Sequence, residues 1–255
     1  MKKIAVITGA NGGFGREFVK LLAAEDVSEI WTIARNEESL NALAREYGGK
    51  IRTFAMDLTD RANITAIEQA LTSEEAEIQY LINNAGYGKF CAYHELTAEQ
   101  SLNMLDLNIG ALVALCLVCI PFMKKGSHIL NIASVASFLP LPYLNLYSAS
   151  KAFVRNYTRA LNVELKSKGI GATAVCPCWM DTPFLARGRT GSEKEITNFY
   201  GITTPDKVAR RALKDAKKGK DISLYGGYSK FMRFGAKLLP QKTMMKIWLK
   251  QQRLK

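Results

Sequence analysis

Thr8-Gly9-Ala10-Asn11-Gly12-Gly13-Phe14-Gly15 is the stretch of sequence that decides the fold. It follows a β-branched apolar run, Ile4–Thr8, and precedes a helical pattern over Phe14–Ala24. Glycines at such a junction allow a tight turn and let the backbone approach a pyrophosphate, toward which the free N–H groups of the following helix point. The stretch therefore predicts a dinucleotide-binding unit, with Gly9, Asn11, Gly13, Phe14 and Gly15 at the phosphate site.

The rest of the chain alternates strand-like and helix-like segments. The expected strands are Ile4–Thr8, Ile30–Ala34, Ile51–Met56, Tyr80–Asn83, His128–Ala133 and Gly171–Cys176, with Leu224–Tyr225 as a last short strand. The expected helices are Phe14–Ala24, Glu37–Tyr47, Arg61–Leu71, Ala98–Met123, Tyr147–Lys168 and Asp206–Lys218. This alternation predicts an α/β fold, a Rossmann-type doubly wound parallel sheet in three αβα layers.

No repeat or linker divides the chain, so residues 1–226 are expected to form one catalytic domain. Within it, residues 181–204 are polar and contain three glycines, which is typical of a substrate loop or lid. Residues 227–255 are expected to be a separate basic, amphipathic helical tail. The longest uncharged apolar run, Ile109–Met123, is shorter than the roughly 20 residues that span a bilayer, and we expect a cytoplasmic protein.

The second expected strand ends in Ile33-Ala34-Arg35-Asn36, without an acidic residue. Sites for NAD usually place a carboxylate near this point, on the ribose 2′-hydroxyl. A carboxylate would repel a 2′-phosphate, whereas the Arg35 guanidinium can pair with it. The pattern favours NADP(H) as the cofactor.

Tyr147-Ser-Ala-Ser-Lys151 places a phenol and an ammonium on one face of an expected helix. A free phenol has a pKa of about 10, and a nearby ammonium is expected to lower it toward the range useful for acid–base catalysis. Ser134 follows the fifth strand, where its hydroxyl can reach a substrate carbonyl.

Several motifs in the right order give the chain its resemblance to the short-chain dehydrogenase/reductase family, over about residues 2–218. They are Thr8-Gly with Gly13 and Gly15, Asp57-Leu58, Asn83-Asn84-Ala85-Gly86, Asn108, Ser134, Tyr147 and Lys151. The resemblance implies that Asn108, Ser134, Tyr147 and Lys151 form a catalytic tetrad. It also implies cofactor contacts from Asp57, Leu58, Asn84, Ala85, Gly86, Pro177, Met180 and Thr182, in addition to the glycine turn, Arg35 and three of the tetrad residues, Asn108, Tyr147 and Lys151. One departure is Cys178, which stands where the family usually has glycine and puts the geometry of that loop in question.

The family mechanism implies that Tyr147 donates a proton to a carbonyl oxygen, which Ser134 hydrogen-bonds. Lys151 would hold the nicotinamide ribose, and Asn108 would order a water for proton relay. We expect an apolar pocket suited to a hydrophobic ketone such as a steroid, lined by Leu139, Tyr143, Leu144, Trp179, Met180, Phe184, Phe199 and Tyr200. Two alternatives remain open: a 3-oxoacyl-thioester reductase, and a non-catalytic NADP-binding sensor on the same fold. The second is disfavoured because all four tetrad residues are present.

The net charge of +12 is concentrated in the tail, where eight basic residues follow Asp221 without any acidic residue, and this leaves +4 for the preceding chain. The body is therefore not expected to bind nucleic acid. We favour packing of the tail over the pocket or a neighbouring subunit over contact with an anionic membrane. The resemblance implies a homodimer or homotetramer. The five cysteines suit neither a disulfide framework nor a zinc site, so no metal is expected.

Overall fold

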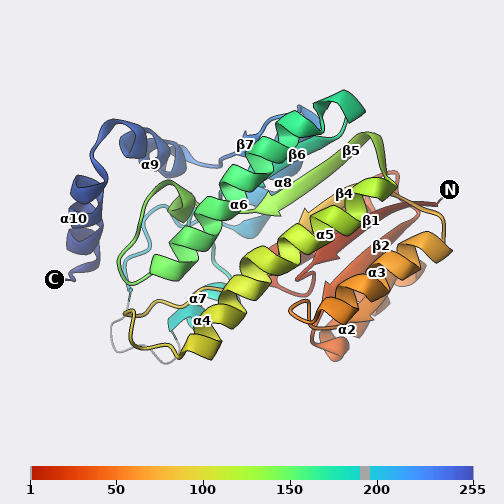
Figure 1. Ribbon diagram of the computed structural model, residues 1–255, viewed down its shortest axis with the longest axis horizontal. Coiled ribbons are helices and arrows are strands. Elements are labelled where there is room, and N and C mark those ends of the chain that lie inside the picture. Colours follow the sequence, from red (N-terminus) through yellow and green to blue (C-terminus); the bar gives the residue numbers. More distant parts are fainter. Residues whose placement is uncertain (1, 190–195, 255) are drawn as a thin grey trace.

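The computed structural model describes residues 2–189 and 196–254, in which helices cover both faces of one central sheet (Figure 1). The strands are β1 (Lys2–Thr8), β2 (Glu29–Ala34), β3 (Ile51–Ala55), β4 (Ala76–Asn83), β5 (Met123–Ile132), β6 (Gly171–Val175) and β7 (Ile222–Ser223). The helices are α1 (Gly13–Ala23), α2 (Glu37–Tyr47), α3 (Arg61–Ser73), α4 (Ala98–Leu105), α5 (Leu112–Cys119), α6 (Asn145–Glu164), α7 (Pro183–Arg189), α8 (Pro205–Lys217), α9 (Gly227–Leu238) and α10 (Gln241–Gln252). Residues 190–195 of the expected loop and Lys255 of the tail lie outside the described residues.

The sheet has seven parallel strands in the order β3-β2-β1-β4-β5-β6-β7. The chain winds outward from β1 to β3 and then returns to place β4 on the other side of β1. In such sheets ligands bind at the carboxyl ends of the strands where the order reverses, here between β1 and β4. The predicted Rossmann-type fold is confirmed.

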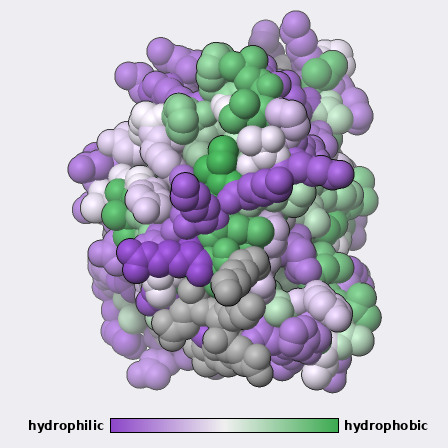
Figure 2. Space-filling view, turned by 90° about the vertical axis from the view of Figure 1, so that its left-hand side faces the viewer, coloured by the Kyte–Doolittle hydropathy of each residue, from purple (hydrophilic) through white to green (hydrophobic). Residues whose placement is uncertain are grey.

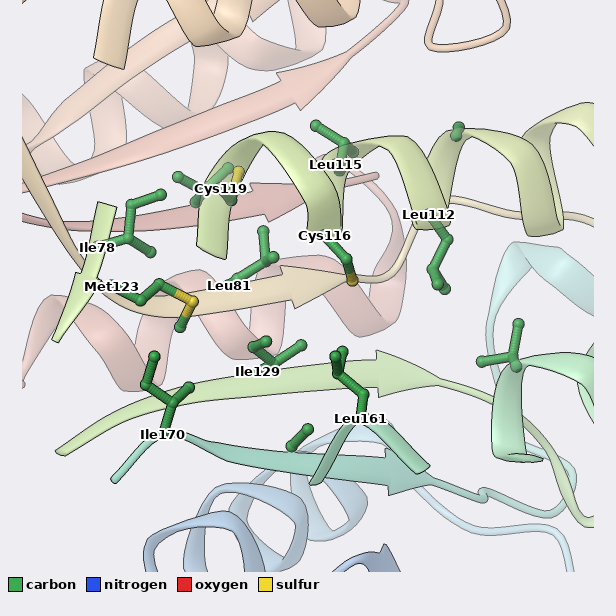
Figure 3. Close-up of a cluster of buried hydrophobic side chains, with 14 of the residues drawn as sticks. Ile78, Leu81, Leu112, Leu115, Cys116, Cys119, Met123, Ile129, Leu161 and Ile170 are labelled. Atoms are coloured by element: carbon green, nitrogen blue, oxygen red, sulfur yellow. The ribbon is translucent and has the colours of Figure 1, made fainter. Parts of the chain in front are cut away.

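Two apolar layers hold the helices against the sheet. Successive residues of β1 point to opposite faces: Ile4 and Val6 pack toward α3, α5 and α6, and Ala5 and Ile7 toward α1, α2 and α8. A strand buried on both faces reads as a continuous apolar run, as this one does. Figure 3 shows the first layer, where Cys116 of α5 points toward β4, and Leu115 and Cys119 of the same helix belong to the same buried cluster.

The helix before β5 is longer than its apolar run suggests. Ala98–Phe122 is one helical segment of 25 residues, which by length and composition alone could cross a membrane. The expected helix Ala98–Met123 is therefore confirmed, and the whole helix is long enough to span a bilayer although its uncharged run Ile109–Met123 is not. Its buried residues Leu112, Leu115 and Cys116 fill the core, so packing against the sheet already accounts for the apolar character of that side.

Two expectations about the second half of the chain are corrected, and the expected helical tail is made of two helices. The segment 181–204 contains a helix, α7, because Pro183 can occupy the first turn of a helix. The last strand is Ile222–Ser223 rather than Leu224–Tyr225, since it pairs with Ala174 and Val175 of β6. The tail forms two helices, α9 and α10, which meet at Pro240.

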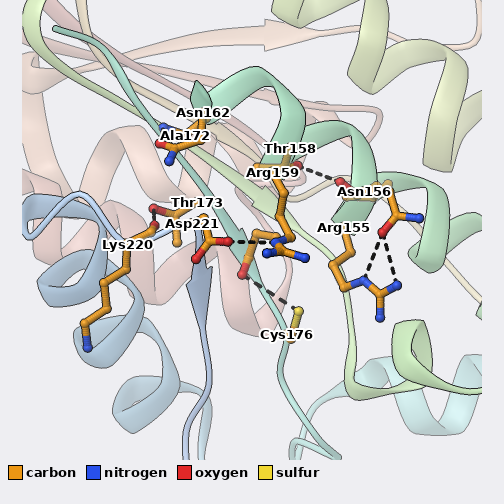
Figure 4. A network of polar contacts seen from close by, with 12 residues as sticks. Arg155, Asn156, Thr158, Arg159, Asn162, Ala172, Thr173, Cys176, Lys220 and Asp221 are labelled. Atoms are coloured by element: carbon orange, nitrogen blue, oxygen red, sulfur yellow. Dashed lines mark hydrogen bonds and ion pairs between the residues drawn. The ribbon is translucent and has the colours of Figure 1, made fainter. Parts of the chain in front are cut away.

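Polar contacts fix this edge of the sheet to α6 (Figure 4). The Arg159 guanidinium on α6 pairs with Asp221 beside β7 at 2.7 Å, and the Thr173 hydroxyl on β6 donates to the Lys220 carbonyl at 2.6 Å. These contacts hold the strand that leads into the tail beside α6, the helix that carries Tyr147 and Lys151.

Candidate active site

A cavity of about 230 Å³ opens at the carboxyl ends of the central strands. Its wall includes Gly9 after β1, Asn84 after β4, Ala133 after β5 and Pro177 after β6. The structure brings most of the predicted site residues to this wall, namely Gly9, Asn11, Gly13, Phe14, Asn84, Ala85, Gly86, Ser134, Tyr147, Lys151, Pro177, Met180 and Thr182. Sequence positions far apart therefore meet at the predicted edge of the sheet.

The glycine turn has the shape that a dinucleotide phosphate requires. Gly9 has a φ of +60°, a conformation that side-chain-bearing residues rarely adopt. A Cβ on Gly15 would overlap the carbonyl oxygen of Gly9, so Gly15 packs behind the turn rather than on the cavity wall. A Cβ on Gly13 would stand 3.0 Å from the Thr182 methyl group, which narrows the space at the start of α1. The turn fits a pyrophosphate at the amino end of that helix.

Asn84 and Thr8 join the turn to β4. The Asn84 amide donates to the carbonyl oxygens of Thr8 at 3.1 Å and Gly9 at 3.0 Å. In return, the Thr8 hydroxyl accepts hydrogen bonds from the backbone N–H groups of Asn84 and Ala85. These contacts fix Asn84 and Ala85, two of the expected cofactor contacts, beside the glycine turn.

Arg35, Asp57 and Leu58 do not line the cavity but lie beyond the turn, at the ends of β2 and β3. The Arg35 side chain is 76% exposed and is 3.8 Å from the Asp57 carboxylate. Partial burial would raise the pKa of Asp57, but hydrogen bonds from Thr59 and the Arg35 charge lower it overall. Arg35 thus keeps an open guanidinium at the end of β2, beyond the glycine turn.

Sequence reasoning missed Ser39 at this end of the site. Its hydroxyl accepts a hydrogen bond of 2.7 Å from the Asn11 amide, which links the glycine turn to α2. Asn36 caps α2 by accepting from the Ser39 backbone N–H. The helix-capping pattern at Asn36 was the only sign of Ser39 in the sequence, because the contact between Ser39 and Asn11 joins two elements that are separate in the chain.

Ser134, Tyr147 and Lys151 converge at the inner end of the cavity. Ser134 follows β5, and its side chain accepts from the Ala136 N–H at 3.1 Å, while Tyr147 lies in the first turns of α6 and lines the same cavity as Ser134. One helical turn further on, the Lys151 Nζ lies 5.7 Å from the centre of the Tyr147 ring and donates to the Ile132 carbonyl at 2.7 Å.

Burial sets the electrostatics of this group. It raises the pKa of the Tyr147 phenol to about 12, against the lowering effect of the hydrogen bond with Ser134. It also lowers the pKa of the Lys151 ammonium to about 8. In the chain on its own, burial of the phenol outweighs the lowering of the Tyr147 pKa that was expected from Lys151, and the net shift is upward.

Asn108 lies one layer behind the cavity wall, within a π-helical stretch, Asp106–Ala111. Its amide donates to the Tyr87 carbonyl at 2.9 Å and the Ser150 hydroxyl at 3.2 Å, and its oxygen accepts from the Tyr87 N–H. A Cβ on Gly86 would lie 2.8 Å from the Asn108 oxygen and 3.5 Å from the Lys151 Nζ. Asn108 therefore holds the Gly86–Tyr87 segment against Lys151, and its role in a water relay stays a prediction.

Around Tyr147 the cavity is otherwise apolar. Of the expected pocket residues, Leu139, Leu144, Trp179, Met180 and Phe184 line it. Tyr143, Phe199 and Tyr200 do not, which corrects those three assignments. Phe199 packs behind Trp179, with ring centres 4.9 Å apart, and Tyr200 stacks on Tyr228 instead.

The tail completes this apolar part of the cavity. Tyr228 and Met232 of α9 and Trp248 of α10 line the cavity, and Met244 is buried beside Trp248. In sequence, Met244 and Trp248 showed only the four-residue spacing of one helix face. That spacing identifies a buried face but does not say which surface covers it.

Cys178 occupies the usual glycine position without backbone strain. Within the described residues, the only non-glycine residues with positive φ are Glu75, Tyr143 and Arg253. The Cys178 thiol donates to the Tyr200 carbonyl at 3.4 Å, and the residue lines the cavity. The cysteine side chain is therefore part of the pocket wall and needs no strained backbone conformation.

Comparisons with known proteins agree with this arrangement. The family model of short chain dehydrogenases matches residues 3–193. A 3beta-hydroxysteroid dehydrogenase of Mediterraneibacter gnavus is 30% identical over 191 residues, which cover 73% of this chain and 69% of that protein.

Two solved structures show the same fold with different cofactors. A short-chain dehydrogenase from Sphingobium yanoikuyae in complex with NADPH has a TM-score of 0.78 and 28% identity, covering 96% of this chain and 95% of the other. A 3-ketoacyl-(acyl-carrier-protein) reductase from Brucella melitensis complexed with NADH has a TM-score of 0.74 and 27% identity, covering 86% and 94%. The family match, the sheet order and the convergence of Ser134, Tyr147 and Lys151 lead to one conclusion: this chain belongs to the short-chain dehydrogenase family and is an oxidoreductase of that family that uses a nicotinamide cofactor.

Proposed function

We propose that the protein interconverts a ketone and a secondary alcohol on a hydrophobic substrate, with NADP(H) as cofactor. The observation that carries this proposal is the position of Tyr147. Tyr147 shares a cavity wall with Ser134 and Lys151, between the glycine turn and a set of apolar side chains. A carbonyl group held there would lie between a proton donor and the dinucleotide site.

The chain's own residues account for the proton chemistry. A bound nicotinamide supplies or accepts the hydride. With a pKa of about 12, Tyr147 is protonated at neutral pH and can give its proton to the carbonyl oxygen, while the Ser134 hydroxyl hydrogen-bonds that oxygen as negative charge develops. The Lys151 ammonium, one helical turn away, stabilises the phenolate that remains.

Arg35 supports NADP(H) over NAD(H). It is an exposed guanidinium at the end of β2, and its contact with Asp57 is loose at 3.8 Å. A guanidinium can pair bidentately with a 2′-phosphate, and no carboxylate at the end of β2 competes for that place.

The cavity wall supports a lipophilic substrate. Leu139, Leu141, Leu144, Trp179 and Met232 present carbon surface near Tyr147. The similarity to a 3beta-hydroxysteroid dehydrogenase is consistent with a flat, bulky ketone in such a space.

The direct test is NADPH oxidation by the full chain against steroids, acyl thioesters, sugars and quinones. We expect the highest kcat/KM with a steroid or another apolar ketone, and loss of turnover in Tyr147→Phe. Turnover confined to sugars would overturn the substrate class. Tight NADPH binding without turnover of any carbonyl would indicate the cofactor-binding sensor instead.

A 3-oxoacyl thioester remains the second candidate because of Arg187. This exposed cation on α7 lines the cavity, where Lys151 is the other charged lining residue. It could pair with the phosphate of a phosphopantetheine arm while the acyl chain enters the apolar part. For this substrate, Arg187→Gln should raise KM for a 3-oxoacyl-CoA and leave KM for a neutral ketone unchanged.

We further propose that the protein works as a homodimer or homotetramer. Leu102 and Leu117 of the long helix and Phe153 and Val163 of α6 are exposed apolar residues on neighbouring helices. Light scattering should give at least twice the mass of one 28.3 kDa chain, and Leu117→Asp should reduce it.

A further inference from the structure

The outer face of α9 carries an apolar ridge. Phe231, Phe234 and Leu238 are 67%, 61% and 64% exposed. Their spacing of three and four residues places them on one side of the helix. Met232, on the opposite side, lines the catalytic cavity. One face of α9 is thus used in the fold, and the ridge lies on the other.

Exposed basic side chains are carried by both tail helices and by the residue that follows α10. They are Lys230, Lys237, Lys242, Lys246, Lys250 and Arg253. In the described part of the chain no ion pair involves any of them, and no acidic residue follows Asp221 in the sequence.

The two tail helices direct their cations away from the cavity. On α10, Lys246, Lys250 and Arg253 lie on the side of the helix opposite to the buried Met244 and Trp248. Figure 2 shows this side of the molecule, where green apolar groups and purple hydrophilic groups lie next to one another on the surface. The surface combines carbon groups with unpaired positive charge.

We propose that α9 and α10 form a docking surface for an anionic lipid membrane. Aromatic and aliphatic side chains next to lysines are the combination that binds at the boundary between headgroups and acyl chains. A second copy of this chain would present the same cations, so like-charge repulsion disfavours self-association through this face. The positive charge therefore favours a negatively charged partner surface. The exposed apolar ridge favours a surface into which apolar side chains can insert, as they can into a lipid membrane.

The proposal is compatible with the tail's inner contacts and does not depend on the proposed reaction. Met232, Met244 and Trp248 face inward and stay packed, while the ridge and cations face outward. The tail can therefore cover the cavity and rest on a membrane at the same time.

The test is cosedimentation of the full chain with phosphatidylcholine vesicles, with and without phosphatidylserine, at low salt. We expect binding only to the phosphatidylserine vesicles and release by salt, because exposed charges are screened within about 10 Å at 0.1 M ionic strength. The variant Phe231→Ser/Phe234→Ser and the variant Lys246→Glu/Lys250→Glu should each weaken binding by about tenfold or more.

Matched controls use exposed residues elsewhere. Tyr93→Ser removes an exposed aromatic group from a loop, and Lys207→Glu/Lys214→Glu makes the same charge change on α8. Both should bind like the unaltered chain, and all variants should keep its melting temperature. If the α8 variant lost as much vesicle binding as the α10 variant, binding would depend only on the net charge of the protein, and the proposal would be overturned. Absence of phosphatidylserine-dependent binding would also overturn it, and would leave an acidic protein as the partner class to pursue.

Discussion

The indole N–H of Trp248 donates a hydrogen bond to the carbonyl oxygen of Pro142, with 3.0 Å between the two atoms. Pro142 lies five residues before Tyr147, in the segment that leads into α6. The last helix of the chain is therefore attached next to the catalytic helix, although more than a hundred residues separate the two partners. A change in the tail should reach the cavity through this contact.

Trp248→Ala should destabilise the protein and enlarge the cavity. Removing a buried tryptophan typically costs about 3–5 kcal/mol, and Trp248 is buried. Chemical denaturation should show this loss, and KM for an apolar ketone should rise. Trp248→Phe, which keeps an aromatic ring and loses the hydrogen bond, should cost about 1 kcal/mol. If Ile247→Ala, at the more exposed neighbouring residue, lowered the free energy of unfolding by as much as Trp248→Ala, this account would be contradicted.

Tyr147→Phe should lower turnover by roughly 10²-fold or more while the fold and cofactor binding stay intact, because only the proton-donating hydroxyl is removed. Steady-state kinetics and a cofactor-binding titration measure the two effects separately. Tyr200→Phe is the control, since Tyr200 does not line the cavity. A well-folded Tyr147→Phe protein with near-normal turnover would show that another group donates the proton.

The rate of ketone reduction should depend on the charge of Lys151. Burial lowers the pKa of its ammonium to about 8, so the charged form predominates below that pH and is lost above it. Tyr147, with a pKa of about 12, stays protonated over the same range. The kcat/KM for reduction should therefore be level at low pH and fall as pH rises through about 8. A profile that rises through this range would contradict the assignment, and Lys151→Arg should move the fall to higher pH.

Catalytic efficiency should be at least about tenfold greater with NADPH than with NADH, because one charge-assisted pair contributes about 1.5–3 kcal/mol. Arg35→Asp should reverse the preference, since a carboxylate repels a 2′-phosphate and can accept from a 2′-hydroxyl. The same change at Arg45, on the last turn of α2, serves as the control for net charge. Equal use of both cofactors by the unaltered chain would refute the NADP(H) assignment.

Gly15→Ala should destabilise the glycine turn and weaken cofactor binding, because the new methyl group would overlap the Gly9 carbonyl oxygen. Gly49→Ala adds the same group where it meets nothing within 4 Å, and should leave stability nearly unchanged or slightly raised. Melting curves with and without NADPH compare the two variants. Similar behaviour of both would mean that the turn relaxes at little cost.

Local signals predicted most of the sheet. The expected strands Ile4–Thr8 and Ile30–Ala34 lie within β1 and β2, and the expected helix Glu37–Tyr47 is α2. Their periodicity is strong because each buries a continuous face. The errors fall where pairing with another segment decides the outcome: β7 is set by Ala174 and Val175 of β6, and α7 forms within a stretch that is polar in sequence.

The sequence by itself determined the dinucleotide turn, the order of strands and helices, and the candidacy of Ser134, Tyr147 and Lys151, because each depends on residues close together in the chain. Only the tertiary structure decided that Asn108 acts behind the wall and that Trp248 closes the cavity. It also decided that burial, rather than Lys151, sets the pKa of Tyr147. These properties depend on which distant segments pack together and exclude water from one another. The spacing of residues along the chain does not predict that packing.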